Sequence, residues 1–216
     1  MSKKAGVIFD MDGTLWDSAQ QVAESWTQVT LKTKGVERAV TAEDLQSVMG
    51  KTMDKIADAL FPTLPVKERM DLLEECCRVE NEYLRENGGT LYEGVEETFK
   101  ALKAAGYHVY IVSNCQSGYI EAFLDYYGLW SHIEDIECFG NNNKPKGENI
   151  RLVVERNSLD KAVYVGDIQG DYEASKDAGV GFIHAAYGFG KIDTPVAAIK
   201  DIAQLTELIK TELPLE

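Results

Sequence analysis

The sequence lacks the features that mark secreted, membrane-spanning and zinc-binding proteins. Its four cysteines form no C-x-x-C pair and its three histidines are scattered, so we expect neither disulfides nor a zinc site. No apolar run is long enough to span a membrane, and the N-terminus has no signal-peptide hydrophobic stretch or cleavage site. We therefore predict a cytoplasmic protein with reduced thiols and no membrane partner.

Positive charge is also scarce in this chain. The 216 residues include 22 lysines and arginines against 36 aspartates and glutamates, which gives a formal net charge of -14. Such a charge repels nucleic acid and anionic membranes, so no nucleic-acid partner is expected. An acidic protein can still bind a small phosphorylated metabolite where a metal, lysines and backbone amides make a local positive site.

The order of the predicted elements divides the chain into an α/β core and an inserted helical segment. Residues 18–89 are polar and helix-rich, and Ser18 and Thr41 are placed to cap helices there. After this segment helices and strands alternate, which is typical of a parallel sheet covered on both faces. We predict a core made of residues 1–17 and 90–216, and a helical cap domain over residues 18–89.

The ends of the predicted strands are where a site is expected. The predicted strands cover residues 6–9, 107–113, 136–139, 162–166 and 181–185. The main predicted helices cover residues 18–34, 66–86, 96–105, 119–127, 148–157, 172–178 and 202–211. In an open α/β sheet, ligands bind beyond the carboxyl ends of the strands, near the point where the strand order reverses.

The first strand ends in two acids, Asp10 and Asp12, followed by Gly13. Side chains alternate along an extended backbone, so both carboxylates can point into one pocket, where each raises the pKa of the other. Such a pair needs a cation or a shared proton, and both conditions suit a carboxylate nucleophile beside an acid. The alternative interpretation is a strand that ends in an Asp turn, in which Gly13 supplies a positive φ.

Two further strand ends carry groups that suit a phosphate. Ser113 and Asn114 offer a hydroxyl and an amide next to backbone N–H groups, although Ser113 also suits a plain helix cap. Lys144 follows another short strand, where it can pair with a phosphate and with Asp10. Lys146 is the second choice for this role, and the alternative for either lysine is a solvated surface charge.

A fourth strand ends in Asp167, and Asp171 follows four residues later. If a helix begins between them, this spacing places both carboxylates on one side. Oxygen ligands of this kind favour a hard cation, and Mg²⁺ is the expected one. Acids that interact with a helix dipole are the alternative, but four matches at successive strand ends favour a common site.

In this combination the sequence resembles the haloacid dehalogenase-like hydrolase superfamily over the whole chain. The motifs that carry the resemblance are Asp10-Met11-Asp12-Gly13-Thr14, Ser113-Asn114, Lys144-Pro145, and Gly166-Asp167 with Asp171. The resemblance implies a Rossmann-like parallel sheet with its first and fourth strands adjacent. It also implies that the inserted helical segment is a mobile cap of the phosphoglycolate phosphatase-like subgroup.

The same resemblance implies a mechanism. Asp10 would attack phosphorus to form an aspartyl-phosphate, while Asp12 would protonate the leaving oxygen and then activate water. Mg²⁺ would be held by Asp10, by the backbone carbonyl of Asp12 and by Asp167, with Asp171 direct or through water. Lys144 would offset charge on the phosphoryl group. The expected substrate-binding residues are Gly13, Thr14, Ser113, Asn114 and Lys144, with Gly50 and Lys51 from a candidate specificity loop over residues 48–52.

The favoured hypothesis is a Mg²⁺-dependent phosphatase of a small phosphomonoester, acting as a monomer or weak homodimer. The alternatives are a β-phosphoglucomutase-like phosphotransferase and a non-catalytic module that binds a phosphorylated ligand. By resemblance, the acid at Asp12 points to an oxygen leaving group. Three positions have two interpretations each. Lys51 belongs to the specificity loop or is a solvated helix end, and Trp16 lines the pocket or packs at the hinge. The segment Tyr187–Gly190 borders the active site or forms an ordinary turn.

Overall fold

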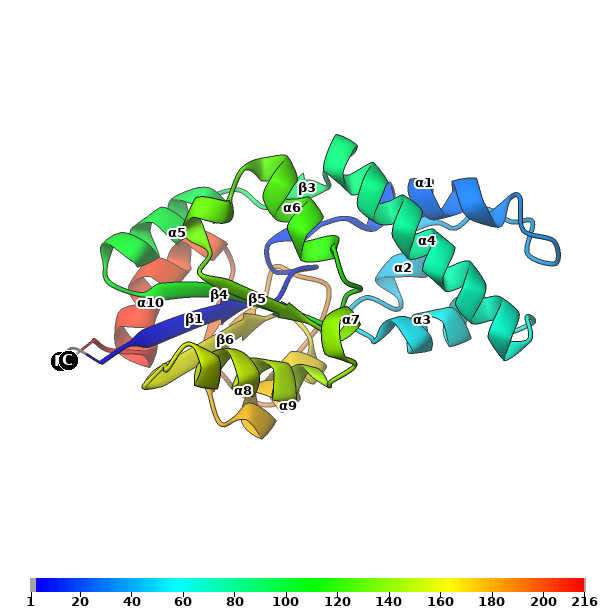
Figure 1. The fold of residues 1–216 in the computed structure, drawn as a ribbon. Helices are drawn as coiled ribbons and strands as arrows, with labels where there is room; N and C mark the ends of the chain where they lie inside the picture. Colours follow the sequence, from blue (N-terminus) through cyan, green and yellow to red (C-terminus); the bar gives the residue numbers. More distant parts are fainter. Residues whose placement is uncertain (1–2, 216) are drawn as a thin grey trace.

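The computed structural model describes residues 3–215, and a six-stranded parallel sheet lies at its centre (Figure 1). The strand order is β5-β4-β1-β6-β7-β8, so β1 lies between β4 and β6. This confirms the predicted α/β fold and the adjacent first and fourth core strands. The strands are β1 Ala5–Phe9, β4 His108–Ser113, β5 Asp135–Cys138, β6 Lys161–Gly166, β7 Gly181–Ala185 and β8 Ala198–Ile199. Residues 1, 2 and 216 of the predicted core lie outside the described residues.

Helices cover both faces of this sheet because its strands are apolar on both sides. In β1, Val7 and Phe9 pack into one apolar cluster, whereas Ile8 packs with Tyr164 into the other, under α8 and α9 (Figure 1). The core helices are α5 Val95–Ala104, α6 Tyr119–Tyr127, α7 Phe139–Asn142, α8 Lys146–Arg156, α9 Gln169–Ala178 and α10 Leu205–Glu212, with 3₁₀ turns at Trp130–His132 and Ile202–Gln204. Among residues 3–215, no helix combines the length and apolar character needed to cross a membrane.

The segment between β1 and α5 contains four helices that lie together at the other end of the molecule from α10 (Figure 1). These helices are α1 Ala19–Thr30, α2 Ala42–Gln46, α3 Met53–Leu60 and α4 Val66–Asn87. Two short strands that we did not predict flank the four helices in the sequence and pair with each other antiparallel. They are β2 Trp16–Asp17, before α1, and β3 Thr90–Leu91, after α4. The chain therefore leaves and re-enters the sheet region side by side. The division into core and cap domains stays a prediction.

Some helix ends and capping contacts differ from the prediction. The first helix was predicted to run to Lys34 but ends at Thr30. Ser18 precedes α1 but makes no capping hydrogen bond, whereas the capping box between Thr41 and Asp44 is confirmed. Trp16 is fully buried with edge-to-face contacts to Phe123 and other rings, so packing is its role at the hinge.

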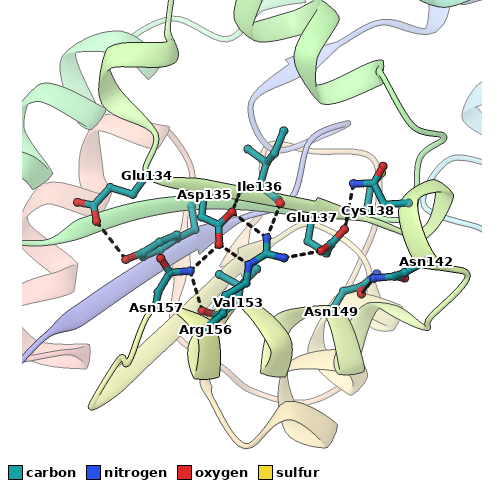
Figure 2. Close-up of polar contacts among 12 residues, drawn as sticks. Glu134, Asp135, Ile136, Glu137, Cys138, Asn142, Asn149, Val153, Arg156 and Asn157 are labelled. Carbon is teal, nitrogen blue, oxygen red and sulfur yellow. Dashed lines mark hydrogen bonds and ion pairs between the residues drawn. The ribbon is translucent and has the colours of Figure 1, made fainter.

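The edge strand β5 is held to α8 by an ion-pair network centred on Arg156 (Figure 2). Arg156 Nε and Nη2 donate to both carboxylate oxygens of Asp135, at 2.5 and 2.8 Å, and Nη1 donates to Glu137 at 2.7 Å. Asn157 adds a bond to Asp135 at 2.6 Å. The other oxygen of Glu137 accepts from Asn141, which ties the turn after β5 to the same network.

We expect Arg156→Ala to lower the free energy of unfolding by roughly 1–3 kcal/mol, because Glu137 is buried and would lose its cation. Arg78 is the matched control, since its ion pairs with Glu75 and Glu82 are exposed on α4. Its alanine variant should lose less stability than Arg156→Ala, because exposed ion pairs contribute little. Urea denaturation of both variants measures the difference, and equal losses would show that the network adds nothing beyond surface pairing.

Candidate active site

Three buried acids meet at the carboxyl edge of the sheet. Asp10 follows β1, Asp167 follows β6, and Asp171 lies in the first turn of α9. Their carboxylate oxygens lie within 4.8 Å of one another, and the three residues are at most 2% exposed. Three like charges this close, out of water, require protons or cations between them.

Lys146 supplies one of these cations. Its Nζ lies 2.9 Å from Asp10 Oδ1 and 2.6 Å from Asp171 Oδ1, and the residue is only 4% exposed. Lys144, the first choice from the sequence, is exposed. Lys146 rather than Lys144 reaches the acids because α8 begins at Lys146, which turns that side chain toward the sheet. Lys144 precedes Pro145, whose backbone is extended.

The start of α8 is braced by two asparagines. Asn142 Nδ2 donates to Asn149 Oδ1 at 2.8 Å (Figure 2), and Asn149 Nδ2 donates to the Lys144 carbonyl at 3.2 Å. Asn142 also accepts from the Lys144 N–H at 2.8 Å. These bonds hold the turn between β5 and α8, and with it the position of Lys146.

Asp171 serves as an anchor for this lysine. Its Oδ1 accepts from Lys146, and its Oδ2 accepts from the backbone N–H groups of Asp167 and Ile168, at 3.0 and 3.2 Å. Gly166 makes room, since a Cβ there would lie 2.6 Å from Asp171 Oδ2. With Asp171 occupied in this way, Asp10 and Asp167 are the carboxylates best placed to hold an ion.

Two glycines and a turn close around Asp167. Gly13 has φ +81°, and a Cβ there would lie 2.2 Å from Asp167 Oδ2; a Cβ at Gly188 would lie 2.4 Å from Asp167 Cβ. Phe189 N–H donates to Asp167 Oδ2 at 2.7 Å. The structure therefore brings the segment Tyr187–Gly190 to the site, and it gives Gly13 a positioning contact with Asp167.

Asp12 lies outside the three-acid cluster but lines the same pocket as Asp10. Its Oδ1 accepts from Ser18 Oγ and from Tyr119 Oη, both at 2.7 Å. Ser18 was expected only as a helix cap, and Tyr119 was not predicted at all. No local signal could have found Tyr119, which lies 107 residues from Asp12 in the chain.

Burial shifts the titration of these groups. Burial raises the pKa of Asp10 to about 7, against the opposing effect of Lys146, and that of Asp167 to about 8, with the Asp171 carboxylate adding to the rise. Burial also raises the pKa of Asp12 to about 6, while the bonds from Tyr119 and Ser18 oppose the rise. For Lys146, burial lowers the pKa, but the Asp10 and Asp171 carboxylates outweigh it and raise the pKa above its ordinary value.

The donor set fits a hard divalent cation. Asp10 and Asp167 offer only carboxylate oxygens, and no histidine or cysteine belongs to the cluster within the described residues. Mg²⁺ prefers one or two carboxylates together with water and phosphate oxygens. An ion held by these two acids would offset the charge that Lys146 leaves unbalanced.

A pocket extends from Asp10 and Asp12 to the four helices of the insertion. From the core it is lined by Asp10, Asp12, Ser113 and Asn114, among others. Asn114 Nδ2 donates to the Gly50 carbonyl at 2.9 Å, while its Oδ1 is buried without a protein partner. Of the other predicted binding residues, Thr14 is buried with an unpartnered hydroxyl, and Lys51 lines the pocket but is exposed.

Glu80 and Gln116 also line this pocket and were missed by sequence reasoning. Glu80 lies on α4 and is only 3% exposed, and burial raises its pKa to about 7. An acid within a long polar helix looks like any surface charge in the sequence. Only the fold shows that this one faces inward.

Comparison with known proteins agrees with this geometry. The family model described as haloacid dehalogenase-like hydrolase matches residues 7–185. Phosphoglycolate phosphatases of Salmonella typhimurium and Escherichia coli strain K12 are each 26% identical over 212 aligned residues, which cover 85% of this chain and 82% of those proteins.

Solved structures share the fold at lower identity. A haloacid dehalogenase-like hydrolase from Bacteroides fragilis superposes with a TM-score of 0.81 at 22% identity, covering 94% of this chain and all of that one. CbbY from Rhodobacter sphaeroides, solved in complex with phosphate, gives a TM-score of 0.77 at 18% identity, covering 94% of this chain and 96% of that one.

The raised pKa values predict how stability depends on pH without metal. The folded chain keeps the protons of Asp12, Asp10 and Asp167 up to pKa values of about 6, 7 and 8, whereas the unfolded chain releases them near the ordinary pKa of 3.8. The free energy of unfolding should therefore fall as pH rises through this range. In EDTA we expect Tm to drop by roughly 2–4 °C for each kcal/mol lost, and Asp167→Asn should flatten the curve.

Mg²⁺ supplies the complementary measurement. Because its ligands must be deprotonated, added Mg²⁺ should raise Tm more at pH 8 than at pH 5. Thermal melts across this pH range, with and without EDTA, provide both data sets. Stability in EDTA that rose toward pH 8 would contradict the assigned shifts.

Proposed function

The chain belongs to the haloacid dehalogenase-like hydrolase family, and we propose that it is a Mg²⁺-dependent phosphatase of a small metabolite that acts through an aspartyl-phosphate. Hydrolysis of phosphomonoesters is the activity of the enzyme; the metal, the intermediate and the substrate belong to the proposal. The observation that carries it is the pairing of buried Asp10 with Lys146, while Asp12 in the same pocket is held by hydroxyl groups.

In the proposed first step, the Asp10 carboxylate attacks phosphorus and the bond to the leaving oxygen breaks. Lys146 fixes one oxygen of Asp10 and places a positive charge beside the incoming phosphoryl group. Mg²⁺ held by Asp10 and Asp167 would supply further charge neutralisation. Ser113 and the unpartnered Oδ1 of Asn114 lie in the same pocket, where they can orient the ester.

Asp12 is the proposed proton donor and acceptor. Its raised pKa, near 6, leaves a proton available for the leaving oxygen, and the resulting carboxylate can then take a proton from the attacking water. Ser18 and Tyr119 stabilise that carboxylate between the two steps. Water attack releases phosphate and regenerates Asp10.

We further propose that residues 18–89 act as a cap that closes over this site. The loop over residues 48–52 reaches the core, because Asn114 bonds to Gly50 and a Cβ at Gly50 would lie 2.4 Å from Ile168 Cδ1. The proposal includes a cytoplasmic monomer or weak homodimer with no nucleic-acid partner. The protein has four cysteines, and all are free thiols: Cys76, Cys77, Cys115 and Cys138.

A phosphate-release screen over a panel of phosphomonoesters tests the function. We expect release with Mg²⁺, loss of release in EDTA, and at least about a 10³-fold loss in Asp10→Asn, which removes the nucleophile. Interconversion of sugar phosphate isomers without net release would favour the mutase-like alternative. Binding without turnover of any ester would favour a phosphate-binding module.

The two lysines give a matched pair of variants. Lys146→Met should lower kcat by roughly 10²–10³-fold, because it removes the buried charge beside Asp10. Lys144→Met should stay within about twofold of the wild type, since this side chain is exposed. Steady-state kinetics on the best ester of the panel decides, and a larger loss at Lys144 would return that residue to the catalytic role.

A further inference from the structure

Glu80 is a buried acid in the part of the pocket that faces the insertion. It belongs to α4, is 3% exposed, and lines the same pocket as Asp10 and Asp12. It does not belong to the cluster of Asp10, Asp167 and Asp171. Its position is that of a group that contacts the rest of the substrate.

The contacts of Glu80 leave hydrogen-bonding capacity unused. Its Oε2 accepts from Trp26 Nε1 at 2.5 Å, and its Oε1 accepts from Gln116 Nε2 at 3.0 Å. A carboxylate has about four acceptor positions, so roughly two remain. Within residues 3–215, no basic side chain forms an ion pair with Glu80.

Burying an acid without a cation is costly, and an apolar side chain would be more stable at such a place. Packing does not explain why an acid stands among apolar pocket residues such as Val22, Leu45 and Ile56. A ligand that donates a hydrogen bond would satisfy the free acceptor positions. Binding such a ligand would explain why an acid occupies this position.

The charge of the pocket points the same way. Asp10, Asp12 and Glu80 are acidic, and Lys51, the one basic residue that lines this pocket in the described part of the chain, is exposed. A carboxylate on the organic part of the substrate would meet buried acids, with only a solvated lysine at the pocket wall. The cavity has a volume of about 40 Å³ and is lined by both Asp10 and Glu80, so one small ester can reach both acids.

We propose that Glu80 selects the leaving group, and that this group presents a hydroxyl or amino donor rather than a carboxylate. Trp26 and Gln116 hold the Glu80 carboxylate in place as positioning residues. This inference rests on the proposed phosphatase function, and it narrows the substrate class to small hydroxyalkyl or aminoalkyl phosphates.

Four esters of similar size test the proposal with Mg²⁺ present. 2-Hydroxyethyl phosphate and O-phosphoethanolamine carry a donor, ethyl phosphate carries none, and 2-phosphoglycolate carries a carboxylate. We expect kcat/KM for at least one donor ester to exceed that for 2-phosphoglycolate by about tenfold or more. The ranking of the two donor esters distinguishes an ammonium from a hydroxyl ligand.

Glu80→Gln should lower the ratio of kcat/KM between the preferred donor ester and ethyl phosphate by roughly 10- to 100-fold, since a hydrogen bond to a charged group is lost. Glu86→Gln is the matched control, because Glu86 is exposed on the same helix. Circular dichroism checks that both variants fold. If Glu80→Gln does not fold, the wild-type ranking alone decides.

Two results would overturn the inference. One is a wild-type preference for 2-phosphoglycolate, in which case Lys51→Ala would test the exposed lysine as the carboxylate partner. The other is a Glu80→Gln variant with the same ratio as Glu86→Gln. Either result leaves the phosphatase function standing, whereas failure to release phosphate from any ester, p-nitrophenyl phosphate included, would overturn the function and this inference together.

Discussion

Repulsion among three buried carboxylates is the constraint on which the site depends. Asp10, Asp167 and Asp171 can share one edge of the sheet because Lys146 bridges Asp10 and Asp171, while Asp10 and Asp167 are placed to share an ion. Much of the surrounding structure maintains this arrangement. The absence of a side chain at Gly13, Gly166 and Gly188 allows close backbone approach, and the braced start of α8 delivers the lysine.

The two acids of the first motif are separated in function by what surrounds them. For Asp10, burial and the neighbouring acids raise the pKa, whereas the charge of Lys146 favours the carboxylate form. Asp12 is turned toward the pocket by Ser18 and Tyr119, whose hydroxyls hold it without a full opposite charge. Two residues apart in sequence, they occupy environments suited to different chemistry.

The main strands of the sheet and the acids that follow them were predictable, because apolar runs that end in polar residues reflect burial directly. Of the strand order, only the adjacency of the first and fourth core strands was expected, and this came from the family resemblance. Lys146 was ranked below Lys144, since the choice depends on the residue at which α8 begins, and helix ends are weakly encoded. Tyr119 and Glu80 could not be found, because their roles arise from contacts between segments far apart in the chain. The strands β2 and β3 were too short to leave a pattern.

The pairing of β2 with β3 has a consequence for the length of the insertion. Because the two strands bring the ends of the insertion together, the positions at which the chain leaves and re-enters the core do not depend on the number of residues between the strands. Doubling the length of a flexible connection costs only about 0.6 kcal/mol in closure entropy. The segment between the two strands can therefore gain or lose residues with little entropic penalty for the six-stranded sheet.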